Sequence, residues 1–340
     1  DGFFTEEWLN NVEQVLSGKT PDYLVIQHME PDHSASIPAF LKKYPNATVV
    51  STAKGFQFME QFFPEFFAGQ GLPAEQRIVA ANDGVLELGQ HSLHFVYAPM
   101  VHWPEVMMTY EATEKILFAA DGFGKFGALD AEKEGADEAR RYYIGIVGKY
   151  GPQVQAVLKK AAGLDIQTIC SLHGPVLKEN LGFYLEKYDK WSSYQPEESG
   201  VVIAYASVYG NTRNAAEYLA DVLQEKGQKT VLYDLARCDK AKAVADAFRY
   251  DRLVLAGITY NGDLFPCMRS FIEGLTERNY QNRKVAIIEN GTWAPMAGKL
   301  ILGMFEKSKN LTFTETTVSI KSAMNEQNKG EIGKLAEELS

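Results

Sequence analysis

Seven residues of types that bind metal ions stand at or just after predicted strand ends. They are His28, Glu30, Asp32, His33, His102, Asp121 and His173. The first four fall within the stretch QHMEPDH, residues 27–33, and the other three follow later strand-like segments. Loops at one edge of a sheet lie close together, so we expect these side chains to converge.

Seven donors, three of them carboxylates, suit a pair of metal ions better than a closed zinc site with four donors. In an extended segment the side chains at 28, 30 and 32 point to one side and that at 33 to the other, so one loop can serve two ions. A solvated acidic loop explains the motif alone but not the other strand-end donors. His91 and His94 are interpreted as surface or rim histidines and left out.

A second group of loops, in the other half of the chain, predicts a mononucleotide site. The stretch VVIAYASVYGNTRNAA, residues 201–216, is a strand, a hydroxyl- and Gly-containing loop and a helix, which together form an anion site at the helix N-terminus. It matches neither the P-loop nor the dinucleotide fingerprint. Loops 257–266 and 289–298 follow later strands and offer Tyr260 and Trp293 to a flat ring.

The elements that must position these residues alternate along the chain. In the second half, apolar runs at 201–207, 229–235, 252–257, 284–290 and 315–320 have helical stretches between them, which indicates a doubly wound parallel sheet. The helix predicted from Asn211 to Lys226 ends at Gly227. In the first half, runs at 22–27, 47–52, 77–81, 92–99, 115–121 and 166–173 indicate a mixed α/β domain, after an amphipathic helix that ends at Gly18.

The stretch KWSSYQPEESG, residues 190–200, loses the apolar period and is interpreted as a linker. The predicted domains are therefore 1–196 and 197–340.

The 340 residues carry 34 Lys and Arg against 44 Asp and Glu, a net charge of −10 that disfavours binding to nucleic acid and to anionic membranes. No apolar run is long enough to cross a bilayer, and three scattered cysteines favour reduced thiols, so we expect a soluble cytoplasmic protein without a disulfide.

The metal motif closely resembles the metallo-β-lactamase fold in its flavodiiron form, in which H-x-H-x-D-H becomes H-x-E-x-D-H, here HMEPDH. The resemblance implies an αββα domain with two non-haem irons, oxo- or hydroxo-bridged. One iron would be held by His28, Glu30 and His102 and the other by Asp32, His33 and His173, with Asp121 bridging. Members of the family differ in whether the residue at His33 binds. The carboxylate of Glu30 favours iron over zinc.

The second half resembles flavodoxin, which implies a five-stranded parallel sheet that binds FMN. Its FMN-binding residues would be Ser207, Val208, Tyr209, Gly210, Asn211, Thr212, Thr259, Tyr260, Asn261, Gly262, Asn290, Gly291, Thr292 and Trp293. Together the halves resemble the flavodiiron proteins over essentially the whole chain. Family members usually begin with a β-hairpin before the helix that starts here, so we expect the first domain to be incomplete at its N-terminus. The missing piece is expected either as a separate, nicked fragment or as residues that are present but not numbered.

The resemblance implies an oxygen reductase, a nitric oxide reductase, or both. Two ferrous ions and reduced FMN supply four electrons, enough to take O2 to two waters, and two NO need two electrons to give N2O and water. Because no C-x-x-C pair of a fused rubredoxin is present, a separate rubredoxin-like donor is expected. A head-to-tail homodimer, or a dimer of such dimers, would set the FMN of one chain against the diiron site of the other.

Two other functions stay open at this point. One is a zinc-dependent hydrolase of the metallo-β-lactamase fold with a flavodoxin-like accessory domain, against which Glu30 argues. The other is a plain electron carrier with a vestigial metal domain, against which the intact set of donors argues. The sequence does not choose between O2 and NO, since selectivity depends on groups around the metals; Phe123 and Phe126 are candidates and are equally candidates for core residues.

Overall fold

The computed structural model describes residues 2–69, 71–128 and 135–340. Its contacts divide the chain into two compact units, Asp1–Gly135 with Pro152–Glu186 and Ala136–Gly151 with Lys187–Ser340. Among the described residues, no helix is both long and apolar enough to span a membrane. Both units combine helices with sheets, as the alternating pattern predicts.

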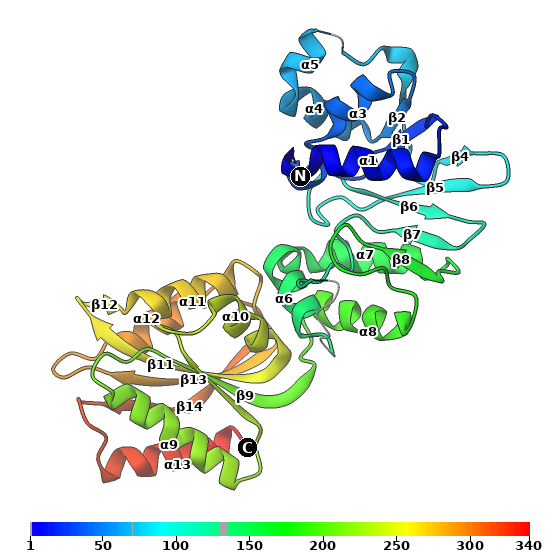
Figure 1. The fold of residues 1–340 in the computed structure, drawn as a ribbon. Coiled ribbons are helices and arrows are strands. Elements are labelled where there is room, and N and C mark those ends of the chain that lie inside the picture. The colour runs from blue at the N-terminus through cyan, green and yellow to red at the C-terminus, as the bar shows by residue number, and fades with distance from the viewer. Residues whose placement is uncertain (1, 70, 129–134) are drawn as a thin grey trace. The chain divides into compact units, whose positions relative to one another are not determined.

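The first unit contains a parallel sheet and a mostly antiparallel one (Figure 1). In the described part of the unit, the parallel sheet has the order β1 (Tyr23–Val25), β2 (Thr48–Ser51), β3 (Arg77–Val79). The other sheet has the order β4 (Val85–Glu87), β5 (Ser92–Tyr97), β6 (Met107–Glu111), β7 (Ile116–Phe118), β8 (Thr168–Cys170). Among the described strands of this second sheet, β7 and β8 pair in parallel and the other neighbours pair antiparallel. The metal-binding candidates follow β1, β5, β7 and β8.

Short helices flank these sheets. They are η1 (Gly2–Phe4), α1 (Thr5–Leu16), α2 (Pro31–Ser34), α3 (Ile37–Lys43), α4 (Ala53–Phe62), α5 (Pro64–Ala68), η2 (Ala74–Gln76) and α7 (Gly151–Ala161), and α8 (Leu181–Ser192) runs on into the second unit. Apolar residues of α1, α3 and α4 pack with β1 and β2 around the fully buried Met29 and Val49. The loop between β1 and α2, which carries His28 and Glu30, is therefore anchored in a core.

The second unit has a parallel sheet in the order β10 (Thr230–Asp234), β9 (Glu198–Tyr205), β11 (Tyr250–Tyr260), β13 (Arg283–Asn290), β14 (Leu311–Ile320). The short β12 (Asp263–Leu264) adds antiparallel to β11. Helices α9 (Asn211–Glu225) and α13 (Glu326–Glu338) cover one face, and α10 (Lys240–Arg249), α11 (Pro266–Thr276) and α12 (Ala297–Met304) cover the other (Figure 1). Helix α6 (Asp137–Ile146) and the turn η3 (Gly148–Tyr150) also belong to this unit.

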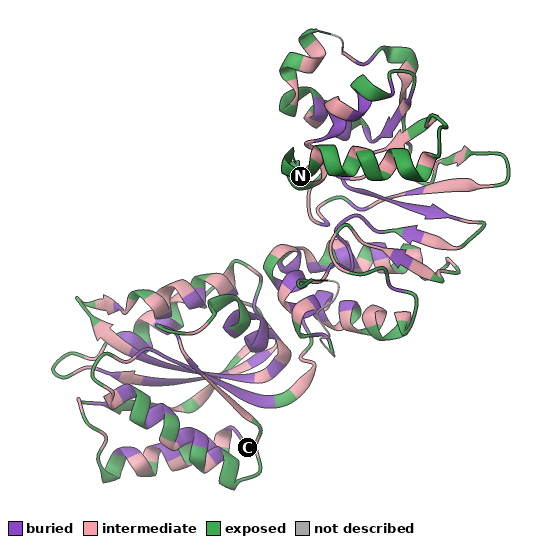
Figure 2. Cartoon of the chain, in the orientation of Figure 1, coloured by how far each residue is buried: buried purple, intermediate pink, exposed green. Residues whose placement is uncertain are grey.

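Burial explains why these strands are continuous apolar runs. Val201 and Ile203 pack under α9 and α13, while their neighbours Val202 and Ala204 are equally buried on the opposite face. Figure 2 shows the central strands as the buried layer of the unit. A parallel sheet covered on both faces excludes water from all its side chains, so alternation with polar residues is absent.

The structure confirms the predicted fold class, and its strands overlap every predicted one. Three strands were missed, β4, β6 and β12: two are very short, and β6 is wholly buried, so its sequence shows no alternation. The extended backbone expected through residue 33 was wrong. Pro31 begins helix α2, because proline is suited to a first helical position, so Asp32 and His33 lie on a helical turn.

Candidate metal centre and nucleotide pocket

The seven candidate donors of the first unit lie in two adjacent groups. The first consists of His28, Glu30, His102 and Asp121, and the second of Asp32, His33 and His173; within each group the donor atoms lie within 4.8 Å of one another. The loop after β1 contributes to both groups, because Glu30 immediately precedes helix α2 and Asp32 lies inside it. His102, Asp121 and His173 come from the loops after β5, β7 and β8.

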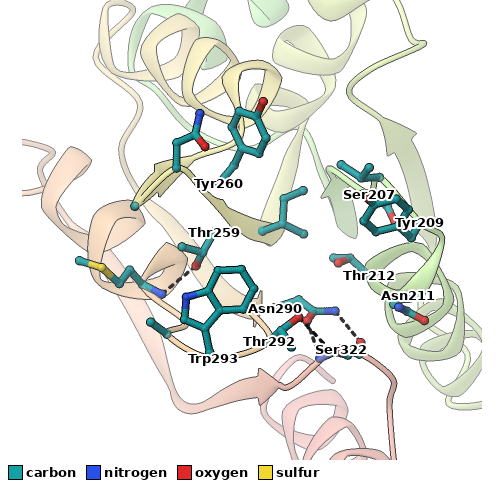
Figure 3. A pocket seen from close by; sticks show the side chains of 17 residues that line it. Ser207, Tyr209, Asn211, Thr212, Thr259, Tyr260, Asn290, Thr292, Trp293 and Ser322 are labelled. Carbon is teal, nitrogen blue, oxygen red and sulfur yellow. Dashed lines mark hydrogen bonds between the residues drawn. The ribbon is translucent and has the colours of Figure 1, made fainter.

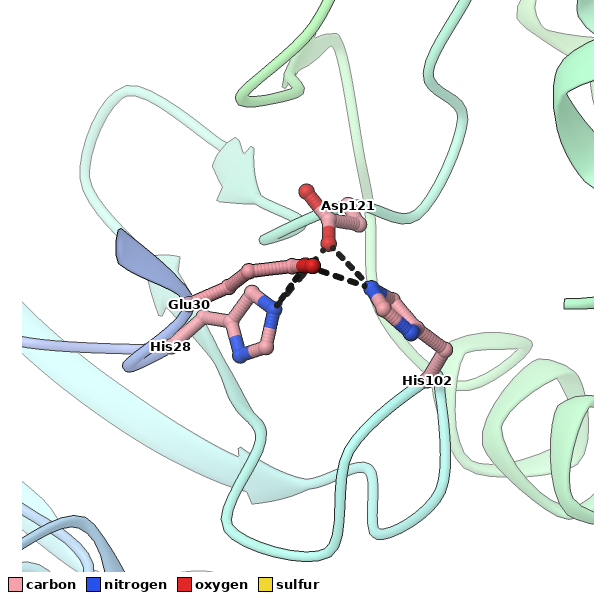
Figure 4. A group of neighbouring side chains, drawn as sticks. All are labelled: His28, Glu30, His102 and Asp121. Atoms are coloured by element: carbon pink, nitrogen blue, oxygen red, sulfur yellow. Dashed lines mark hydrogen bonds and ion pairs between the residues drawn. The ribbon is translucent and has the colours of Figure 1, made fainter. Parts of the chain in front are cut away.

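In the first group, imidazole nitrogens face carboxylate oxygens (Figure 4). His102 Nε2 lies 3.0 Å from both Glu30 Oε2 and Asp121 Oδ2. His28 Nε2 lies 3.3 Å from Glu30 Oε2 and 3.2 Å from Asp121 Oδ2. All four donor atoms therefore surround one small volume.

The second group is joined to the first through Asp121. His33 Nε2 lies 3.1 Å from Asp121 Oδ1, and His173 Nε2 lies 3.5 Å from the same oxygen. Both nitrogens also approach Asp32 Oδ2, at 3.2 and 3.3 Å. Asp121 thus turns one carboxylate oxygen toward each group, the arrangement of a bridging carboxylate.

Burial is uneven across this cluster. Asp121 is 1% exposed and His28 3%. The side chains of Glu30, His173 and Asp32 are 35, 36 and 43% exposed. The cluster therefore has a rigid buried side and a side that a small molecule can reach from solvent.

Electrostatics tie the buried members together. Burial acts to lower the pKa of His28, but its contacts with Asp121 and Glu105 outweigh burial and raise the pKa to about 10. Burial acts to raise the pKa of Asp121, yet hydrogen bonds from His102, His28 and His33 hold it well below its usual range. The Asp121 carboxylate is therefore ionised, and its surroundings stabilise its negative charge.

The donor set fits metal ions. His33 Nε2 and His173 Nε2 face each other at 3.1 Å, and two ring nitrogens at that distance share at most one proton. A cation between them gives both lone pairs a partner. Imidazole and carboxylate donors without thiolate suit iron, manganese or zinc. Backbone strain also falls here, because Ala120, directly before Asp121, has a φ of +49°.

The sequence interpretation overlooked one carboxylate beside this cluster. Glu105, in the loop before β6, is 3% exposed and lies against His28. Its only sequence signal is an acidic residue three positions after His102. His91 and His94 lie outside both groups, hydrogen-bonded to Glu111 and Ser92.

The second unit has a cavity of about 510 Å³ beyond the carboxyl ends of β9, β11 and β13 (Figure 3). Every predicted FMN-binding residue except Gly210 lines it. Ile258, Ala294, Met296 and Ser322 line it too and were not predicted. Ser322 follows β14, whose loop had no Gly or aromatic residue to mark it.

The loop after β9 has the form of an anion site. Gly210 stands before α9 with a φ of +92° and offers no side-chain cap, so the first N–H groups of the helix stay available. Its own N–H donates to Ser207 Oγ at 3.2 Å, which closes the loop. Thr212 is 2% exposed and lines the cavity at the helix start.

Hydrogen bonds between loops shape the rest of the cavity. Thr259 Oγ1 accepts from the N–H groups of Met296 and Ala297, at 2.8 and 3.2 Å, and so holds the start of α12 against β11. The Asn290 side chain donates to the carbonyl of Ser322 at 2.9 Å and accepts from its N–H at 3.0 Å. Thr259 and Asn290 thus hold the segment between β13 and α12, which carries Trp293, beside the ends of β11 and β14.

Three aromatic rings surround the cavity (Figure 3). Tyr209 and Trp293 are 92 and 89% exposed, and Tyr260 is 47% exposed with its ring edge-on to Phe265. Exposed rings beside an apolar cavity favour a flat ligand that covers them.

Family models match both halves of the chain. Residues 3–174 match the ODP family β-lactamase model, and residues 202–311 match a flavodoxin domain model. The predicted boundary near residue 196 falls between these stretches and stays a prediction.

Curated relatives are similar over most of this chain. A diflavin flavoprotein of Synechocystis sp. is 32% identical over 244 residues, 69% of this chain and 41% of that protein. A nitric oxide reductase of Moorella thermoacetica is 27% identical over 307 residues, 88% of this chain and 75% of that protein. The chain thus spans less than two thirds of the length of some curated relatives it matches.

The fold also matches a solved structure. The rubredoxin oxygen:oxidoreductase of Desulfovibrio gigas superposes with a TM-score of 0.89 at 23% identity, over 99% of this chain and 84% of that one. At this identity the likeness establishes the fold, and the chemistry of the sites is argued from the side chains of this chain.

Proposed function

The chain belongs to the flavodiiron proteins, with an ODP-family β-lactamase-like domain joined to a flavodoxin domain, and on that premise we propose that it reduces O2 to water, NO to N2O, or both. The proposed cofactors are two iron ions in the first unit and FMN in the second. The observation that carries the proposal is Asp121, which turns one oxygen toward each of two donor groups.

The seven donors named above are the proposed iron ligands. Asp121 would hold two ions side by side, and Glu30 supplies the anionic donor that favours iron. When bound, a ferrous pair supplies two electrons and a position at which a diatomic gas reacts. The buried His28 keeps its side of the centre rigid, while the half-exposed side of Glu30, Asp32 and His173 leaves a path for the gas.

The cavity of the second unit supports FMN as the electron relay. The open N–H groups at the start of α9 and the Thr212 hydroxyl suit a terminal phosphate. Tyr209, Tyr260 and Trp293 offer faces and edges for the isoalloxazine. Backbone groups of the loops held by Thr259 and Asn290 would contact its polar edge.

A rubredoxin-like protein is the proposed electron donor, because the structurally similar Desulfovibrio gigas protein is named for it. A head-to-tail homodimer is proposed because electrons must pass quickly between sites in separate units. Sedimentation of the active protein tests this: full activity in a strict monomer would contradict it. The cytoplasm stays the predicted location, and the three cysteines are free thiols.

The test is to purify the protein without oxygen, measure iron, zinc and flavin per chain, and follow consumption of O2 and of NO after reduction. We expect two irons, one FMN and consumption of at least one gas. His102→Ala should abolish consumption, whereas His94→Ala, a histidine outside both donor groups, should preserve it. Stoichiometric zinc with thioester or phosphodiester hydrolysis would instead favour the hydrolase, and flavin without iron would favour the electron carrier.

A further inference from the structure

A buried carboxylate outside the proposed ligand set makes direct contact with one ligand. The Glu105 side chain is 1% exposed, and its Oε1 lies 2.7 Å from His28 Nδ1. The same oxygen accepts the Met29 N–H at 2.9 Å. One carboxylate oxygen therefore contacts both the ring of His28 and the backbone that follows it.

The backbone of Glu105 is itself held in place. Thr52, the N-cap of α4, donates its hydroxyl to the Glu105 carbonyl at 2.9 Å and accepts the Gly55 N–H at 3.0 Å. Ser51, next to Thr52, donates to the carbonyl of Ile26 at 2.9 Å. The turn from β2 into α4 thus anchors both Glu105 and the end of β1, so the distance between Glu105 and His28 is set by the core.

A third contact restricts the ring of His28. The indole of Trp103 meets it edge-on, with centroids 5.2 Å apart and planes at 86°. With Nδ1 bound to Glu105, the other nitrogen, Nε2, faces Glu30 and Asp121 at 3.3 and 3.2 Å. The ring has one orientation that satisfies all these contacts.

We propose that Glu105 is a positioning residue of the metal centre: it holds the Nδ1–H of His28 and so presents the Nε2 lone pair to the metal shared with Glu30, His102 and Asp121. The inference rests on the proposed function, because it assigns Glu105 a role toward the metal ion that the first donor group would bind. A ligating histidine commonly donates its second N–H to a carboxylate, and losing that partner weakens metal affinity about 10- to 100-fold.

A purely structural role explains the arrangement less well. Satisfying the Met29 N–H needs one neutral acceptor, whereas Glu105 brings a buried carboxylate whose Oε2 has no hydrogen-bond partner among the described residues. A buried carboxylate oxygen without a donor is destabilising. A carboxylate that accepts the N–H of a metal-binding histidine explains why a charged side chain is buried at this position.

The test measures metal binding and not turnover. Iron-loaded wild type, Glu105→Leu and Glu105→Gln are equilibrated with graded chelator, and iron per chain is measured. We expect Glu105→Leu to hold one of its two irons about 10- to 100-fold more weakly. Glu105→Gln keeps an oxygen that can accept from Nδ1–H, so its loss should be smaller.

Glu111→Gln is the matched control. Glu111 is also a buried carboxylate that contacts a histidine, His91, and accepts backbone N–H groups, those of Thr113 and Glu114, away from the metal donors. The Glu111→Gln protein should bind both irons as tightly as the wild type does. Equal iron binding in wild type and Glu105→Leu would overturn the inference, as would equal weakening of both irons together with a matching loss of stability in the metal-free protein.

A metal-independent readout separates this inference from the proposed function. With only six histidines in the chain, ¹⁵N-labelled histidine gives a simple spectrum. The metal-free wild type should show a His28 Nδ1 proton protected from exchange, and Glu105→Leu should lack it. Failure of the wild type to bind two irons would sink the proposed function, whereas an unchanged Nδ1 proton in Glu105→Leu would sink the role of Glu105 alone.

Discussion

Glu197, between α8 and β9, offers the sharpest quantitative prediction for stability. Its side chain is 0% exposed and accepts from Arg140 through both oxygens, from Lys187 Nζ at 2.7 Å and from Trp191 Nε1 at 2.7 Å. Arg140 is itself buried. These contacts join α6, α8 and the start of β9 within the second unit. The perturbation is Glu197→Gln, which keeps the shape and removes the charge.

The magnitude follows from the pKa of Glu197. Burial acts to raise it, but the hydrogen bond and charge of Arg140, with Lys187 and Trp191, lower it from 4.5 to about 2. The difference of about 2.5, at about 1.36 kcal/mol for each pKa unit, amounts to about 3 kcal/mol. Because the folded pKa is the lower one, this stabilisation is complete above pH 4.5 and is lost as the pH falls from 4.5 toward 2.

The assay is urea unfolding followed by tryptophan fluorescence, at neutral pH and at several values down to pH 2. Glu197→Gln should lower the unfolding free energy by about 3 kcal/mol at pH 7, and the gap from wild type should close in acid. Glu198→Gln is the matched control: its side chain is 33% exposed against Lys229 and Arg249, so a loss of only about 0–1 kcal/mol is expected. Equal losses, or a gap independent of pH, would refute the reasoning.

Three further predictions concern the two candidate sites. Trp293→Ala should weaken FMN binding about 2- to 10-fold, by loss of an aromatic contact, in a flavin fluorescence titration; unchanged affinity would show that the ring does not contact the flavin. Thr259→Val leaves the N–H groups of Met296 and Ala297 without their acceptor, so the unfolding free energy should fall by about 1–3 kcal/mol, and an unchanged urea midpoint would contradict this. Removing metal by chelation should lower the thermal midpoint, because ions at about 100 times their Kd contribute about 2.7 kcal/mol; calorimetry with and without iron checks this, and identical midpoints would argue against a metal centre.

The sequence by itself determined the types and the order of the chemical groups. HMEPDH, three later strand-end donors and three loops after apolar runs were enough to indicate the fold class and two separate sites. These features are local: the apolar period of a segment identifies it as a strand or a helix, and loops that follow strands of the same direction lie at the same edge of a sheet. The strands β5, β7 and β8, which precede His102, Asp121 and His173, share one direction although their sheet is mostly antiparallel.

Only the tertiary structure decided which atoms meet. Three contacts depend on side-chain directions that packing sets. Asp121 turns one oxygen to each donor group, and Asn290 hydrogen-bonds to the backbone of Ser322. Glu105 contacts His28, which lies 77 residues earlier in the chain. Helix α2 likewise replaced the extended backbone expected after Glu30. A linear pattern records which residues share an edge of a sheet, but hydrogen bonds act over about 3 Å, and that precision arises only when the core fixes every element at once.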